Sequence, residues 1–132
     1  MRNGIIDRFC PENTWALYEK LVQTSGIRGD ISLRQENGNE YILWRVSDAL
    51  EITAYVEADF GEGYIGIEKY AMHWHPEIGQ IYTDLKDIGG EGCIMVVRKT
   101  AGGMQTLYMG PKDGYEEAKY NRWYLRKPIV LE

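Results

Sequence analysis

Residues 50–60 read LEITAYVEADF, and this stretch decides the class of fold that we expect. Its side chains fall into two sets that alternate along the chain. The apolar set is Ile52, Ala54, Val56, Ala58 and Phe60, and the mostly polar set is Glu51, Thr53, Tyr55, Glu57 and Asp59. Because successive side chains of a β-strand point to opposite faces, the pattern predicts a strand with one buried and one solvated face. Such strands are typical of antiparallel sheets, since the strands of a parallel sheet are buried on both faces.

The residues on either side of this strand predict more antiparallel pairing. Asn37 and Gly38 favour a tight hairpin turn, because both central positions of a type I′ turn require positive φ. The tail of the chain favours a short helix and then an edge strand, where Pro128 removes no ladder hydrogen bond. The further expected strands lie within residues 29–47, 93–99, 105–110 and 115–132.

Two segments have the apolar periodicity of helices, residues 10–26 and residues 76–90. Their expected buried faces are Trp15, Tyr18, Leu21 and Val22 in the first helix, and Ile78, Ile81, Tyr82, Leu85 and Ile88 in the second. Together these elements predict a single α+β domain over residues 1–132. We expect an antiparallel sheet of five to seven strands with two main helices packed on it.

The composition narrows the classes of function. The chain has 15 basic and 20 acidic residues and a net charge of -5, so it lacks the basic face with which proteins bind nucleic acids. No stretch approaches the roughly 20 apolar residues that span a bilayer, and the first residues lack the apolar run of a signal peptide. The two cysteines form no CxxC pair. We therefore expect a cytoplasmic protein with free thiols that binds neither nucleic acid nor membranes, and the oligomeric state stays open.

Residues 59–77, DFGEGYIGIEKYAMHWHPE, contain two signatures that need opposite conformations. The glycine spacing matches a dinucleotide-binding loop, which requires a helix immediately afterwards. His73 and His75 can share a metal ion only on a strand, because on a helix they point about 200° apart. The aromatic residues and the proline after the second histidine favour the strand. We therefore expect a loop in which Gly61 and Gly63 have positive φ, followed by a strand.

The two histidines raise the possibility of a divalent metal such as zinc. A catalytic zinc usually takes three protein ligands and a water molecule. Spacing leaves the third ligand open among Asp84, Asp87, Glu57 and Glu68. The expected metal ligands are His73, His75 and Asp84. A site of this kind implies a metal-dependent hydrolase. The simpler interpretation has no metal: one histidine precedes the second helix and the other packs on an aromatic ring.

A run of acidic residues over positions 48–62 contains no lysine or arginine. Such a run can attract a basic protein partner by electrostatic steering, and the alternative is a solvated strand face without a partner. The chain also has 10 Tyr and 4 Trp, residue types that are favoured as anchors in interfaces. The expected partner-binding residues are Glu51, Tyr55, Glu57 and Asp59.

The middle of the chain, residues 50–99, combines the alternating strand LEITAYVEA with the string HWHPE, the helix IYTDLKDIGG and the strand CIMVVRK. This order resembles small uncharacterised bacterial α+β proteins, some of which are grouped with immunity proteins of polymorphic toxin systems. The resemblance implies a cytoplasmic protein that covers the surface of a toxin. It carries no functional residues over to this chain. The expected function is therefore non-enzymatic partner binding without a cofactor, and the metal-dependent hydrolase is the alternative.

Overall fold

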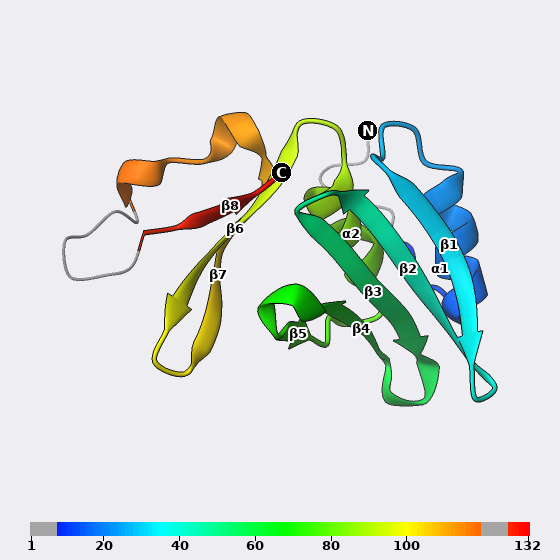
Figure 1. Ribbon diagram of the computed structural model, residues 1–132. Coiled ribbons are helices and arrows are strands. Elements are labelled where there is room, and N and C mark those ends of the chain that lie inside the picture. The colour runs from blue at the N-terminus through cyan, green and yellow to red at the C-terminus, as the bar shows by residue number, and fades with distance from the viewer. Residues whose placement is uncertain (1–7, 120–126) are drawn as a thin grey trace.

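The computed structural model describes residues 8–119 and 127–132, which form two antiparallel sheets and two α-helices (Figure 1). The five-stranded sheet has the order β1-β2-β3-β4-β5, with β1 (Asp30–Glu36), β2 (Asn39–Ser47), β3 (Leu50–Glu57), β4 (Glu62–Ile67) and β5 (Met72–Trp74). The three-stranded sheet has the order β7-β6-β8, with β6 (Cys93–Thr100), β7 (Gly103–Pro111) and β8 (Ile129–Leu131). The helices are α1 (Thr14–Val22) and α2 (Ile81–Gly89). Single-turn 3-10 helices are η1 (Ala58–Phe60), η2 (Glu68–Tyr70), η3 (Lys112–Gly114) and η4 (Glu117–Lys119).

The predicted α+β class with two main helices is confirmed, but the strands belong to two sheets where one was expected. Helix α2 contacts β4 of the first sheet and both β6 and β7 of the second. It therefore carries the chain from one sheet to the other. Alternation along a strand reveals which face is buried, but it does not reveal which strands are neighbours. The edge position predicted for the last strand is confirmed, because β8 lies at the end of its sheet.

The strand that decided the fold class has the predicted alternation. Leu50, Ile52 and Ala54 are fully buried, and the other set points to the opposite face of the sheet. The hairpin turn before it is also confirmed, since Asn37 and Gly38 have φ of 51° and 80°. Ala58 and Phe60 are corrections, because both are exposed and the side chain of Phe60 is 74% exposed. The strand ends at Glu57, and η1 followed by Gly61 in the left-handed region turns the chain back into β4.

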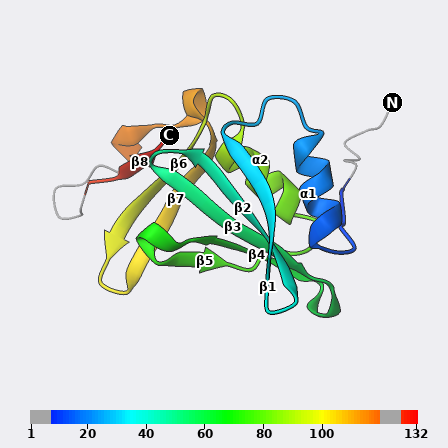
Figure 2. The same ribbon diagram turned by 45° about the vertical axis from the view of Figure 1, so that its right-hand side comes forward.

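Both helices pack on the same face of the five-stranded sheet and bury its apolar side chains (Figure 2). Helix α2 buries Ile81, Leu85 and Ile88, as predicted, whereas Tyr82 is half-buried and Ile78 lies before the helix, which begins at Ile81. The buried residues of α1 are Thr14, Leu17 and Leu21, whereas Trp15 and Val22 are 47% and 46% exposed. The predicted face of α1 was therefore wrong in two positions. The cause is a tertiary contact, because the Thr14 hydroxyl accepts a hydrogen bond from the backbone of Val56 on β3.

The expected strand at the histidines is confirmed as β5, but the glycines are followed at once by β4, where part of a loop was expected, and no α-helix lies between residues 61 and 75. Gly61 has the predicted positive φ of 65°, but Gly63 lies within β4 and does not. Gly63 is needed for space, since a Cβ there would collide with the side chain of Ile81. Between β4 and β5 the turn η2 ends with Ala71 at φ 53°, so the chain reverses and β5 pairs antiparallel with β4. The turn separates the alternating pattern of β4 from that of β5, so Ile67 and Met72 are both buried.

Candidate functional site

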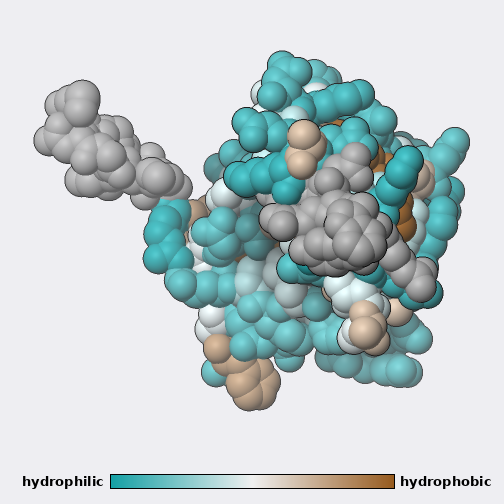
Figure 3. All heavy atoms as spheres, turned by 90° about the vertical axis from the view of Figure 1, so that its left-hand side faces the viewer, coloured by the Kyte–Doolittle hydropathy of each residue, from teal (hydrophilic) through white to brown (hydrophobic). Residues whose placement is uncertain are grey.

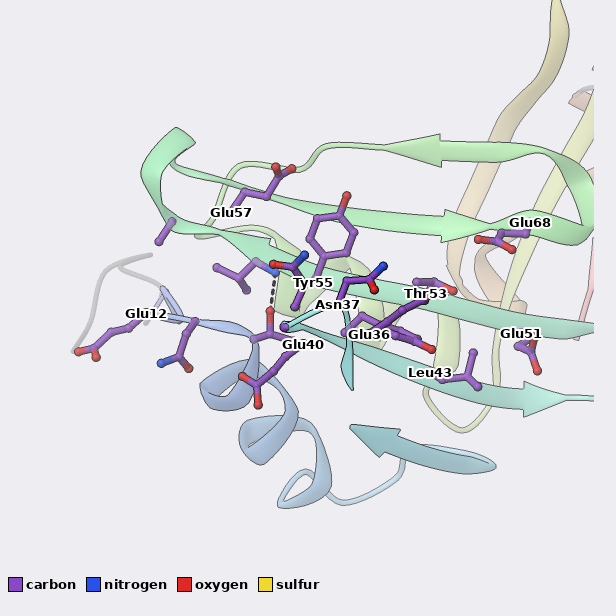
Figure 4. A pocket seen from close by; sticks show the side chains of 17 residues that line it. Glu12, Glu36, Asn37, Glu40, Leu43, Glu51, Thr53, Tyr55, Glu57 and Glu68 are labelled. Carbon is purple, nitrogen blue, oxygen red and sulfur yellow. Dashed lines mark hydrogen bonds between the residues drawn. The ribbon is translucent and has the colours of Figure 1, made fainter. Parts of the chain in front are cut away.

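The candidate site is the face of the five-stranded sheet opposite to the two helices. It carries the polar set of β3, with Arg45 opposite Glu51 and Tyr64 opposite Tyr55 on the neighbouring strands. The sheet is twisted, and the tip of the β1–β2 hairpin and the start of α1 rise beside it. These elements enclose a groove over the sheet (Figure 4).

This groove has a volume of about 910 Å³, and we call it the acidic groove. Its carboxylates come from distant parts of the chain: Glu12, Glu36, Glu40, Glu51, Glu57 and Glu68. Within the described parts of the chain, no lysine, arginine or histidine lines it. One glutamate is partly neutralised from outside, since Arg45 forms an ion pair of 3.2 Å with Glu51. Both side chains of that pair are largely exposed, so solvent screens it and much negative charge is left over the groove.

The floor of the groove is partly aromatic. Tyr41, Leu43 and Tyr55 line it together with Thr53. The ring of Tyr55 stacks on Tyr64 with centroids 4.6 Å apart and an interplanar angle of 8°. Burial of the phenol, reinforced by the negative charge of a nearby glutamate, raises the pKa of Tyr55.

Next to the groove, an aromatic row continues across β4 to both predicted histidines. His73 stacks on Tyr64 at 5.6 Å and 18°, whereas His75 meets Tyr64 edge-on at 5.6 Å and 68°. The two imidazoles lie 5.6 Å apart. Tyr64 can lean toward His73 because Gly66 leaves room for its ring, and a Cβ there would lie 2.6 Å from the phenol oxygen. The structure thus places both histidines on the open face, as two-residue spacing on a strand requires.

The third residue of the predicted metal set lies elsewhere. Asp84 accepts hydrogen bonds from Trp74 at 3.2 Å and from Gln80 at 3.1 Å. Trp74 alternates with the histidines along the chain, so Asp84 lies on the other side of β5. Asp84 and His73 line one pocket, but among the described residues Asp84, His73 and His75 do not form a group whose ligand atoms all lie within 4.8 Å of one another.

His75 instead meets two glutamates at the end of the β3–β4 hairpin. Its Nδ1 lies 3.1 Å from Oε2 of Glu62 and 3.7 Å from Oε1 of Glu57. Glu57 was among the alternatives for a third ligand, whereas Glu62 was not considered as one. A signal for it was present in the sequence, because a short loop with a left-handed Gly61 places the residues that flank it opposite each other.

The expected partner-binding residues are placed unevenly. Glu51, Tyr55 and Glu57 line the acidic groove, but Asp59 lies in η1 and does not. The remaining acidic residues of the groove come from the start of α1, the β1–β2 hairpin and η2. These residues were not predicted, because the prediction considered only the acidic run over positions 48–62. The fold brings acidic residues together from four separate segments of the chain.

On the side that carries the three-stranded sheet, a second pocket of about 540 Å³ is lined by residues of β5, α2 and the β6–β7 hairpin, and Asp84 is the one carboxylate in its described lining. In Figure 3 this side is mostly hydrophilic, and hydrophobic groups are small and separated. Among the described residues, no helix is long and apolar enough to cross a membrane. In comparisons with known proteins, no protein-family model, no curated protein and no solved structure matches this chain.

Proposed function

We propose that this protein is a non-enzymatic interaction protein that binds a basic protein partner through the acidic groove. The observation that carries the proposal is the lining of the groove, which holds six glutamates and, among described residues, no basic side chain. The resemblance of residues 50–99 to immunity-like proteins implies a specific form of this function. In that form, the groove covers a basic surface of a toxin.

The charge of the groove suits a partner with arginine or lysine side chains. Carboxylates that share a concave surface focus a negative potential, which raises the association rate of a basic partner. Arginine fits such a lining best, because its guanidinium can donate two parallel hydrogen bonds to one carboxylate. The glutamates lie on several elements around the groove, so several basic residues of one segment can be bound at once.

The aromatic floor adds contact area that a purely charged surface lacks. Tyr41 and Tyr55 can pack against the aliphatic stems of lysine or arginine, and their rings attract the cationic groups. Tyr55 is held in place by its stacking on Tyr64, so little side-chain entropy is lost when a partner contacts it. The groove therefore combines the two features, charge and rigid aromatics, that favour binding of a basic segment.

A charge-reversal experiment tests this proposal with basic peptides as probes. Glu36→Lys with Glu40→Lys reverses two groove residues, and Glu91→Lys with Glu116→Lys is the matched control with the same change of net charge. The control residues are exposed and lie outside the groove. Binding of fluorescent nona-arginine is measured by anisotropy at low and at physiological salt.

We expect the groove variant to bind nona-arginine at least about tenfold more weakly than the wild type, which corresponds to about 1.4 kcal/mol. The control should change much less, because distant charges are screened at physiological salt. Equal weakening of the two variants would show that only net charge matters and would refute the groove as the binding site. Absence of binding by the wild type at low salt would refute the proposal as a whole.

A further inference from the structure

A cluster of three metal-ligating side chains, Glu57, Glu62 and His75, lies where β3 ends and β4 begins. Their donor atoms all lie within 4.8 Å of one another, and in the described part of the chain this is the one such cluster of three or more. We propose that the cluster binds a divalent transition-metal ion, of which zinc is the representative. The cluster shares Glu57 with the lining of the acidic groove, but metal binding by the cluster does not depend on the proposed partner binding.

The distances fit a common ion. Zinc binds imidazole nitrogen and carboxylate oxygen at about 2.0–2.2 Å, so ligand atoms at tetrahedral angles lie about 3.4 Å from one another. The two distances from Nδ1 of His75, 3.1 Å to Glu62 and 3.7 Å to Glu57, lie on either side of that value. Small rotations of the two carboxylates are therefore enough to place all three donors around one ion.

The charges of the cluster also call for a cation. Glu57 and Glu62 are direct cross-strand partners in the β3–β4 ladder. Like charges in that position destabilise a sheet, and a divalent cation between them would cancel the repulsion. Both carboxylates are partly withdrawn from water, with side chains 30% and 37% exposed, so solvent relieves the repulsion only in part.

The backbone holds the three ligands in place before any ion binds. The β-ladder pairs the two glutamates on either side of η1, and Gly61 closes that loop with φ of 65°. On the other side, the carbonyl of Pro76 accepts a hydrogen bond of 2.8 Å from the backbone of Gly63. This bond keeps His75 beside β4, and the edge-on contact with Tyr64 restricts its ring. Ligands carried on strands lose little freedom when an ion binds.

The ligand types select the class of metal. Calcium and magnesium prefer six or more oxygen ligands, whereas one imidazole with two carboxylates suits zinc and similar first-row ions. The imidazole of His75 is 42% exposed, so water can reach the ion and fill a fourth position. The arrangement is that of an open site with three protein ligands.

The two histidines provide a matched test, because both are exposed, lie on the same face and are separated by one residue. Chelator-treated protein is titrated with zinc chloride by calorimetry, for the wild type and for His75→Ala, His73→Ala and Glu62→Gln. We expect one zinc ion per wild-type chain. His75→Ala and Glu62→Gln should each weaken binding by more than about tenfold, since even changes outside the ligand set often cost about 10- to 100-fold. His73→Ala should retain binding, because its ring stacks on Tyr64 and lies outside the cluster.

A second measurement follows thermal unfolding with and without zinc. An ion bound only by the native state raises the midpoint, and we expect this rise in the wild type and in His73→Ala but not in His75→Ala. Absence of zinc binding by the wild type would overturn the site. Equal loss in His73→Ala and His75→Ala would overturn the assigned ligands.

The peptide assay keeps this inference distinct from the proposed function. The variant Glu36→Lys with Glu40→Lys changes no residue of the cluster and should bind zinc as the wild type does. Conversely, His75→Ala changes no residue of the groove lining and should still bind nona-arginine. Failure of one proposal therefore leaves a clear result for the other.

Discussion

Replacing Gly89 by alanine should destabilise the protein, because the added methyl group has no room beside Trp44. Gly89 is the last residue of α2 and is buried against the five-stranded sheet. A Cβ at this position would overlap three atoms of the indole ring of Trp44, which is itself fully buried. The absence of a side chain at Gly89 thus lets α2 approach the sheet at this point.

The indole cannot easily move aside. Its Nε1 donates a hydrogen bond of 2.7 Å to the carbonyl of Arg28, and displacing the ring would leave both groups unsatisfied in a part-buried place. Overpacking of a core typically costs about 1–3 kcal/mol. Alanine gains up to about 1 kcal/mol over glycine in a helix interior, and less at a terminus. We therefore expect a net loss of about 1–2 kcal/mol, or roughly 3–8 °C in the unfolding midpoint for a chain of this size.

Urea unfolding followed by circular dichroism measures this loss, and Gly102→Ala provides the control. Gly102 lies in the loop between β6 and β7, and nothing lies within 4 Å of a Cβ added there. Its stability should stay within about 0.5 kcal/mol of the wild type. Trp44→Phe removes the part of the ring that the new methyl group would strike. The double variant should therefore be more stable than the sum of the two single losses predicts, by about 1–2 kcal/mol of coupling. A stable Gly89→Ala protein, or a coupling near zero, would refute the proposed clash.

Two further predictions concern titratable groups outside the site. Burial, and to a smaller extent the neighbouring Asp84, raises the pKa of Asp87. The ionised carboxylate therefore lowers the stability of the folded state. This loss of stability develops as the pH rises from the pKa of Asp87 in the unfolded chain through its pKa in the folded protein. Asp87→Asn should therefore be more stable than the wild type in urea unfolding at neutral pH, and this difference should vanish below about pH 4. A gain in stability that is the same at all pH values would contradict the prediction. Burial, with a smaller effect of Asp87, also raises the pKa of the half-buried Cys93 thiol, whereas Cys10 is exposed. A disulfide reagent should therefore modify Cys10 quickly and Cys93 slowly. The variant Cys10→Ser should show only the slow phase, and a fast phase in that variant would contradict the prediction.

The parts of the fold that could be predicted are those that local geometry decides. Alternation over β3 and the Asn37-Gly38 turn depend on residues a few positions apart, and both are confirmed. The failures depend on distant contacts. Phe60 continues the apolar alternation in the sequence, but the strand has already ended at Glu57. Likewise α1 offers two apolar stripes, and its packing against β3 decides which one is buried.

The candidate site was predictable to a smaller extent, since its residues come together through strand pairing. The acidic groove draws on the start of α1, the β1–β2 hairpin, β3 and η2, which no single stretch of sequence connects. Two-residue spacing correctly placed the histidines on one face. Spacing left the third ligand open, and Asp84, the residue chosen among the alternatives, bonds with Trp74 on the other side of β5.

The difference between the two histidines shows why sequence spacing alone could not name the ligands. His73 and His75 are the same residue type on the same face, yet their neighbours on β4 differ. Opposite His73 is Gly66, which leaves space that the ring of Tyr64 fills, so this imidazole has an aromatic environment. The bridge between Glu62 and Glu77 continues the same register past β5, and this brings His75 within reach of Glu62. One imidazole is thus positioned for stacking and the other for ligation, and the pairing register of β4 makes the distinction. A change that shifted this register by two residues would place one histidine in the environment of the other and give the second a new neighbour, while leaving the His-x-His spacing intact.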